Sequence, residues 1–152
     1  MKIFLATMVS VLVQPLVLVA RLAPAYLSSS EPFYGIGLMF VAVIVVATAT
    51  ALLLGIPAFL ILKRFSHLNW ASVSVSGALI GGLPIAFLWP REREGYSAGH
   101  NWHGTYVDTY INGTPTNYAW LNYGESVLIF ALHGLLGALV FYAVWRRCNR
   151  PN

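Results

Sequence analysis

Apolar residues fill four long stretches of this chain, and charged residues lie almost entirely between them. The four stretches cover residues 3–20, 36–62, 71–89 and 125–145. Each is close to or longer than the ~20 residues that a helix needs to cross a hydrocarbon core of about 30 Å. The pattern therefore predicts an all-α membrane protein, in which residues 1–152 form one domain built as a bundle of four transmembrane helices.

The composition agrees with this assignment. Of the 152 residues, 58% are hydrophobic and 9% are charged, which is too little polar surface to cover a soluble domain of this size. The single cysteine, Cys148, excludes an intrachain disulfide. It thereby also excludes the thiol–disulfide chemistry of four-helix membrane oxidoreductases.

The first apolar stretch has the outline of a cleaved signal peptide, because Lys2 precedes an apolar run that ends at Ala20. Two features favour a retained helix instead. The run is longer than the roughly 7 to 15 residues of a signal-peptide core, and Gln14 and Pro15 interrupt it. Cleavage would also leave an odd number of spans. We therefore expect four spans, with cleavage of the first as the alternative.

The distribution of basic residues predicts the orientation, because Lys and Arg are retained on the cytoplasmic side of a membrane. One side of the four spans carries six bases and no acid, and the other carries three bases and five acids. The split of +6 against −2 sums to the net charge of +4. We expect both termini to be cytoplasmic, and the short loops favour a bacterial inner membrane. The positive charge then reflects topology and anionic lipids rather than nucleic acid. The six bases are Lys2, Lys63, Arg64, Arg146, Arg147 and Arg150.

Glycines in the third and fourth stretches predict close helix packing. Gly77 and Gly81 form a GxxxG pair, and Gly134 and Gly137 repeat the device. Small residues let two helix backbones approach each other. Two uses are open: a contact between the third and fourth spans of one chain, which we favour, or self-association of two chains through the same face. In the second stretch, Pro57 lacks an amide donor and predicts a kink.

The segment 90–124 is the long hydrophilic piece of the chain, and we expect it to be a 35-residue exoplasmic loop. Residues 105–111 alternate in character, and Asn112-Gly113 follows them as a strong signal for a two-residue turn. A short β-hairpin is therefore predicted. Pro115 cannot donate a ladder hydrogen bond, so the returning strand is expected to be short and at an edge. One face of the first strand would carry Tyr106, Asp108 and Tyr110.

The aromatic residues of this loop predict a surface that binds a partner protein, because Tyr and Trp are the residues that most often anchor interfaces. The alternative is an aromatic belt at the level of the lipid headgroups. We prefer the belt for Trp120 and Tyr123, which directly precede the fourth span. The residues expected to contact a partner are Trp102, Tyr106, Asp108, Tyr110 and Tyr118.

Candidate chemistry in the loop is sparse. His100 and His103, with Asp108 or Glu94, are the nearest approach to a metal site, but zinc and copper sites normally need three or four ligands in a cluster. The sequence also lacks a convincing Ser-His-Asp set, paired carboxylates or a phosphate-binding glycine loop. We therefore expect neither an enzyme nor a cofactor.

Three polar residues of the apolar stretches lie roughly 16 to 18 Å from the cytoplasmic ends of their helices, near the membrane midplane. They are Gln14, Thr50 and His133. A hydrogen bond from His133 to Gln14 or to a threonine would fix the helix register. The alternative is a protonatable group in a transport pathway. We favour the first role, because proton-coupled transport usually relies on intramembrane carboxylates, and the spans contain none away from their ends.

Two functional hypotheses follow. The leading one is a small integral membrane binding protein, either an accessory subunit of a membrane complex or an immunity-type protein, that acts through the aromatic loop. The alternative is an oligomeric channel or transporter built around the His133 and Gln14 layer. Substitutions would distinguish them: loss of function would map to the loop in the first case, and to His133 and Gln14 in the second.

Overall fold

The computed structural model describes residues 2–27 and 35–149 and is 73% helical. Its helical elements are α1 (Lys2–Leu27), α2 (Ile36–Thr50), the π-helical turn η1 (Ala51–Gly55), α3 (Ile56–Arg64), α4 (Trp70–Ala86) and α5 (Asn117–Cys148). Three strands, β1 (Ala98–Trp102), β2 (Thr105–Ile111) and β3 (Thr114–Pro115), form one small antiparallel sheet.

Each of the four predicted apolar stretches forms a helix, although the lengths differ from those expected. Three segments within the described ranges are long and apolar enough to cross a membrane, namely Lys2–Ala20, Ile36–Arg64 and Asn117–Cys148. The fourth apolar helix, α4, is shorter, with 17 residues. It ends at Ala86 rather than at residue 89, and α5 begins at Asn117 rather than at residue 125. The first turns of α5 therefore belong to the predicted loop.

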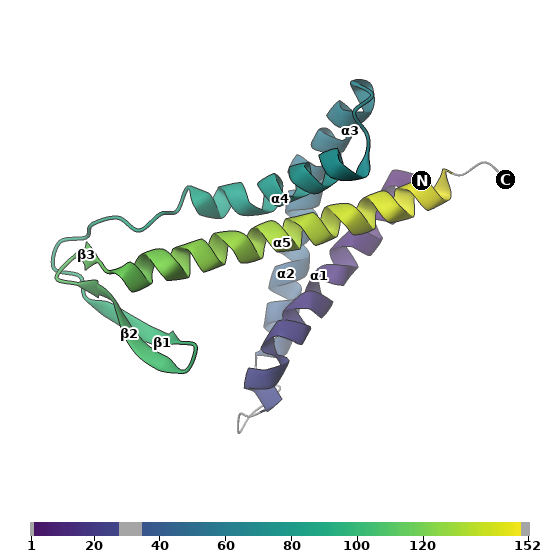
Figure 1. Cartoon of the computed structure of the whole chain (residues 1–152). Coiled ribbons are helices and arrows are strands. Elements are labelled where there is room, and N and C mark those ends of the chain that lie inside the picture. Colours follow the sequence, from purple (N-terminus) through teal and green to yellow (C-terminus); the bar gives the residue numbers. More distant parts are fainter. Residues whose placement is uncertain (1, 28–34, 150–152) are drawn as a thin grey trace.

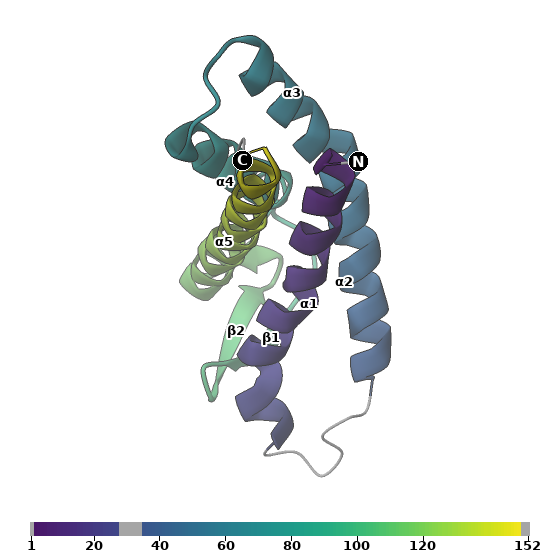
Figure 2. The same cartoon turned by 90° about the vertical axis from the view of Figure 1, so that its right-hand side faces the viewer.

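α5 is the central element of the molecule (Figure 1). It packs against α4 and against α1, while α2 packs on α1. Figures 1 and 2 place the N-terminal end of α1, the C-terminal end of α5 and the connection from α3 to α4 at one end of the molecule, here called the terminal end. The sheet lies at the other end of α5, the sheet end. The α1–α2 pair and the α4–α5 pair diverge from the terminal end, so the helices form two pairs joined through α5.

The helical segment from Ile36 to Arg64 changes direction at the turn that precedes Pro57. Pro57 has no amide hydrogen, so the regular hydrogen-bond ladder is interrupted there. The chain forms the π turn η1 instead, closed by the bond from the Ile56 N–H to the Ala51 carbonyl, and such turns redirect helices. Figure 2 shows α3 leaving the axis of α2. The kink predicted from Pro57 is present.

Glycines bring α4 and α5 into backbone contact. A Cβ atom at Gly77 would lie 2.6 Å from the Gly134 carbonyl oxygen, and one at Gly81 would overlap the Phe130 carbonyl oxygen. The contact between the third and fourth spans is therefore made within one chain. Gly137 faces α1 instead. Self-association through these glycines stays a prediction, and it would compete with the contacts that they already make.

Aromatic side chains join the helices at the terminal end. Phe59 of α3 is 4% exposed, and its ring centroid lies 4.9 Å from that of Phe141 and 5.1 Å from that of Trp145. Trp70 of α4 packs edge-on against Tyr142, with a centroid distance of 4.7 Å. Edge-to-face pairs of this kind stabilise beyond their buried area. They fix α3 and the start of α4 to the last turns of α5.

Candidate functional site

The predicted hairpin is present at the sheet end. Asn112 and Gly113 have φ angles of 49° and 87°, as a type I′ turn requires at both central positions. β3 contains only two residues and ends with Pro115. The strand order is β1-β2-β3, so β3 is an edge strand. The short edge strand expected from Pro115 is confirmed.

The longer hairpin of the sheet was not predicted. β1 pairs with β2 through a turn at His103 and Gly104, whose φ angles of 50° and 87° repeat the type I′ geometry. Histidine is not among the residues that typically mark this turn. Within β1, Gly99 and Asn101 have low strand propensity, so the segment lacks a strand pattern. The one usable signal was Gly104, placed directly before the β-branched Thr105.

The two faces of the sheet have different surroundings. The inner face turns toward α5 and carries Val107 and Thr109, which are 7% and 9% exposed. The opposite face, here called the outer face, carries Asn101, Tyr106 and Asp108, all of which are exposed. Tyr106 is 69% exposed. Burial therefore alternates as predicted from Tyr106 to Thr109, but not beyond, because Tyr110 is half-buried and Ile111 is 52% exposed.

A glycine and an aromatic pair order the outer face. A Cβ atom at Gly99 would lie 2.6 Å from the hydroxyl oxygen of Tyr106, so the glycine makes room for this ring. At the other end of the face, the half-buried Tyr110 packs edge-on against Tyr96 with a centroid distance of 5.2 Å. The Arg93 guanidinium lies 5.6 Å from the centroid of the Tyr96 ring. The outer face is thus a polar and aromatic surface on which contacts position the side chains of Tyr106 and Tyr110.

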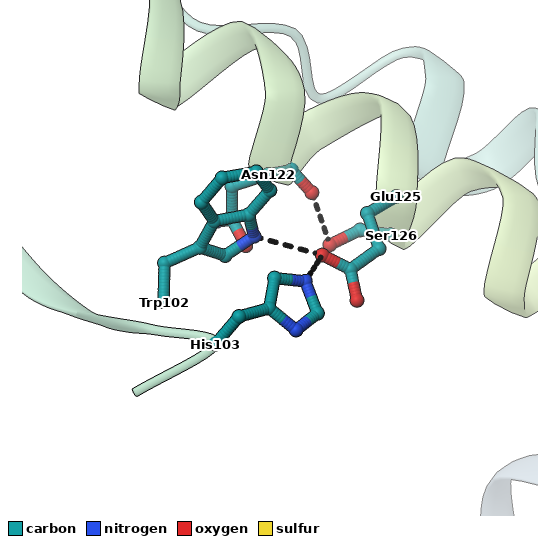
Figure 3. A network of polar contacts seen from close by, with 5 residues as sticks. All are labelled: Trp102, His103, Asn122, Glu125 and Ser126. Carbon is teal, nitrogen blue, oxygen red and sulfur yellow. Dashed lines mark hydrogen bonds and ion pairs between the residues drawn. The ribbon is translucent and has the colours of Figure 1, made fainter. Parts of the chain in front are cut away.

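The tip of the β1–β2 hairpin is fastened to α5 by a polar contact that we call the hairpin anchor (Figure 3). The Trp102 Nε1–H donates to Glu125 Oε2 at 2.9 Å, and His103 Nε2 lies 3.3 Å from the same oxygen. The Trp102 ring also packs edge-on against Tyr118 of α5, with a centroid distance of 5.6 Å. Trp102 and Tyr118, both expected to contact a partner, therefore contact each other between the sheet and α5.

The two histidines of the predicted metal site lie in different surroundings. His100 is half-buried in β1, whereas His103 lies in the turn and faces Glu125. Asp108 lies on the outer face of β2. In the part of the chain that the structure describes, no group of three or more His, Cys, Asp or Glu residues could hold a metal ion. Strand alternation and the turn separate these groups.

Polar side chains of α1 bind the backbone of α5. The Ser10 hydroxyl donates to the Gly137 carbonyl at 2.8 Å, and the Gln14 amide donates to the His133 carbonyl at 3.3 Å. A Cβ atom at Gly137 would lie 2.8 Å from Gln14 Nε2, so the glycine gives the amide access to α5. Ser10 and Gln14 are each 9% exposed. The Ser10 bond is therefore buried between the helices, and the Gln14 bond is partly buried.

The hydrogen bond predicted between His133 and Gln14 is corrected in one respect. Gln14 binds the main-chain carbonyl of His133, and the His133 imidazole instead places Nδ1 2.9 Å from the Ile129 carbonyl of its own helix. Thr50 is the last residue of α2, which packs on α1. Across residues 2–27 and 35–149, no hydrogen bond joins Thr50 to either residue. Gln14 thus contributes a side-chain contact between α1 and α5, whereas the His133 imidazole contacts its own helix.

Comparison with known proteins adds no relative. No protein-family model matches the chain, and no curated protein and no solved structure is significantly similar to it. The function must therefore be inferred from the residues and their geometry.

Proposed function

We propose that the chain is a small integral membrane binding protein, an accessory subunit of a membrane complex or an immunity-type protein, that acts through the outer face of its sheet. Its apolar helices indicate a membrane protein. The observation that carries the proposal is the contrast between the two faces of the sheet. The inner face is fixed to α5, while the outer face leaves Tyr106 69% exposed beside the exposed Asp108.

The hairpin anchor supports this proposal, because a binding surface is most effective when it is ordered before the partner arrives. A small sheet alone is marginally stable in water. Packing on α5 and the bond from Trp102 to Glu125 supply the missing support. Trp102 and Tyr118 then position the hairpin, whereas Tyr106 and Asp108 contact the partner. Tyr110 borders the contact surface.

We place the protein in the bacterial inner membrane with both termini in the cytoplasm. The support is the clustering of positive charge at the terminal end, since cytoplasmic segments are enriched in Lys and Arg. The start of α1, the end of α3 and the end of α5 lie at this end (Figure 1). They carry Lys2, Lys63, Arg64, Arg146 and Arg147. The outer face of the sheet would then face the exoplasmic space.

The test is purification from native membranes in mild detergent, followed by native mass spectrometry of the wild type and of single variants. We expect a stoichiometric partner with the wild type, and at least about tenfold weaker binding with Tyr106→Ala or Asp108→Ala, because exposed interface Tyr residues contribute strongly. Trp120→Ala is the matched control. Trp120 is an aromatic residue near the start of α5 that is 47% exposed and is not part of the sheet.

Two results would contradict the proposal. One is a partner that binds Tyr106→Ala and Asp108→Ala as tightly as it binds the wild type. The other is a homo-oligomer without any partner, which would favour the channel or transporter alternative. Against that alternative, the polar groups of Gln14 and His133 are already used in contacts within and between α1 and α5. Its own test is ion or solute flux through liposomes with His133→Ala.

A further inference from the structure

A recess lies beneath the inner face of the sheet, and the proposed function does not use it. It is bounded by the end of α4, residues 87–93, β1, β2 and the first turns of α5, and it has a volume of about 290 Å³. Both apolar and polar residues line it. The apolar residues include Ile85, Leu88 and Trp89, and the polar ones include Arg93, His100 and Asn122.

We propose that this recess binds the phosphate-bearing headgroup of an anionic phospholipid from the leaflet at the sheet end. Arg and His side chains with an amide are suitable donors for phosphate oxygens, and hydrogen bonds from charged donors are the strong ones. Basic residues at the membrane surface attract anionic lipid headgroups. A recess near the lower limit of small-molecule sites, about 300 Å³, accommodates a headgroup rather than a whole lipid.

The apolar wall favours a lipid over free phosphate. Ile85 and Leu88 line the recess where α4 ends, and the surface continues over large exposed apolar side chains. Phe87 is 65% exposed and Leu88 is 71% exposed. An amphiphile would place its phosphate against Arg93 and His100 and its acyl chains along these residues. Free phosphate would leave the apolar wall without a partner.

Arg93 is positioned for this role, and its neighbour Arg91 is not. The Arg93 backbone N–H donates to the Gly113 carbonyl at 2.9 Å, which fixes the residue beside the sheet. Arg93 is one of the residues that line the recess, and its guanidinium lies 5.6 Å from the centroid of the Tyr96 ring. The Arg91 guanidinium instead lies 4.7 Å from the centroid of the Trp89 ring and is not part of the lining. The two arginines therefore form a matched pair of equal charge, of which Arg93 is a lining residue and Arg91 is not.

The experiment titrates the full chain, purified in a neutral detergent, with dioleoyl phosphatidylglycerol, dioleoyl phosphatidylcholine or inorganic phosphate, and counts bound molecules by native mass spectrometry. We expect one phosphatidylglycerol to bind in preference to the other two. Arg93→Gln should weaken its binding about tenfold or more, because a charge-assisted hydrogen bond is lost. Arg91→Gln should change the affinity by less than about twofold, since only general surface attraction is reduced.

A second variant tests the proposal by filling the recess rather than by removing a charged side chain. Ser126 lines the recess, and its hydroxyl donates to the Asn122 carbonyl of its own helix at 2.8 Å. Ser126→Leu should fill the space and abolish preferential binding of phosphatidylglycerol. Thermal unfolding without lipid checks that each variant is folded. If Arg93→Gln is unfolded, His100→Leu replaces it, because it removes another polar group from the lining of the recess.

Three outcomes would overturn the proposal. Equal weakening by Arg91→Gln and Arg93→Gln would indicate general surface charge. Unchanged binding in both folded Arg93→Gln and Ser126→Leu would place the lipid elsewhere. Binding of inorganic phosphate as tight as that of phosphatidylglycerol would identify a soluble anion as the ligand. The proposal rests on the membrane placement but not on a protein partner, so these outcomes are independent of the partner-binding test.

Discussion

Gly134 lies at the closest contact between α4 and α5. A Cβ atom at this position would lie 2.9 Å from the Gly81 nitrogen and would overlap the Gly77 carbonyl oxygen. Backbone atoms cannot move aside as a flexible side chain can. Close approach in this region therefore depends on the absence of a single methyl group.

We predict that Gly134→Ala lowers the free energy of unfolding by about 1–3 kcal/mol, the usual cost of overpacking. Gly124→Ala on the same helix is the control. No atom lies within 4 Å of a Cβ atom at Gly124, and alanine favours a helix over glycine, so this variant should be unchanged or more stable. Unfolding in mixed micelles followed by circular dichroism measures both. Equal stability of the two variants would contradict the packing role.

Gln14 and His133 should respond differently to substitution. Gln14→Leu removes the side-chain donor to α5 and should cost about 0.6 kcal/mol, the average for such bonds in membranes. His133→Ala leaves the acceptor in place, because that acceptor is the main-chain carbonyl. We therefore expect Gln14→Leu to weaken the contact between α1 and α5 and His133→Ala to preserve it. The measurement is disulfide crosslinking between cysteines introduced on the two helices, and loss of crosslinking with His133→Ala alone would reverse the assignment.

The hairpin anchor predicts that Trp102→Phe loosens the sheet. The substitution keeps an aromatic ring beside Tyr118 but removes the donor to Glu125. A hydrogen bond to a charged group contributes about 1.5–3 kcal/mol, so the amides of β2 should exchange with solvent faster. Hydrogen exchange with mass spectrometry over residues 105–111 measures this. Trp120→Phe serves as the control, and an equal effect of both changes would show that the bond does not fix the hairpin.

At the level of elements, the sequence predicted those helices and turns that depend on neighbouring residues. It did not predict elements that depend on contacts with distant parts of the chain. Asn112-Gly113 predicts its own turn, because the geometry depends on the two residues themselves. β1 was missed because its partner strand, rather than its own propensity, determines its conformation. The start of α5 was placed too late because hydrophobicity locates membrane segments but not the polar turns that extend a helix.

In the candidate site too, local patterns were predicted and long-range contacts were not. Alternation along residues 105–111 is enough to separate the outer face from the inner face, because the period of a strand is two. The contact from Trp102 to Glu125 joins residues 23 positions apart. No periodicity predicts such a pair, which joins Trp102 to α5 and supports the hairpin.

The π turn before Pro57 predicts a measurable bend. Leu38 and Ile61 are exposed on opposite sides of this turn and can carry spin labels. Pro57→Ala restores the missing amide donor, so the distance between the labels should increase toward the roughly 35 Å of a straight helix of 23 residues. Double electron–electron resonance measures this distance. Pro84→Ala in α4 should leave it unchanged, and a wild-type distance that already matches a straight helix would rule out the bend.

On the scale of the whole molecule, the terminal end is basic and the sheet end carries the proposed binding surface. We predict that a membrane-impermeant thiol reagent labels Asp108→Cys in a Cys148→Ser background on intact cells. In the wild type, Cys148 at the end of α5 should react only after the membrane is permeabilised. The reverse pattern would show that the orientation is inverted. Labelling of both positions in intact cells would contradict the prediction that they lie on opposite sides of the membrane.

The shortness of α4 has a consequence for the surrounding lipid. Its 17 residues rise about 26 Å, less than the hydrocarbon thickness of about 30 Å. The glycine contacts hold α4 beside α5. In the proposed membrane placement, we therefore expect the bilayer to become thinner on this side of the molecule. The protein would then carry an asymmetric ring of compressed lipid, and short-chain lipids would collect beside α4. Membrane thickness itself would thereby influence where in the membrane this protein resides.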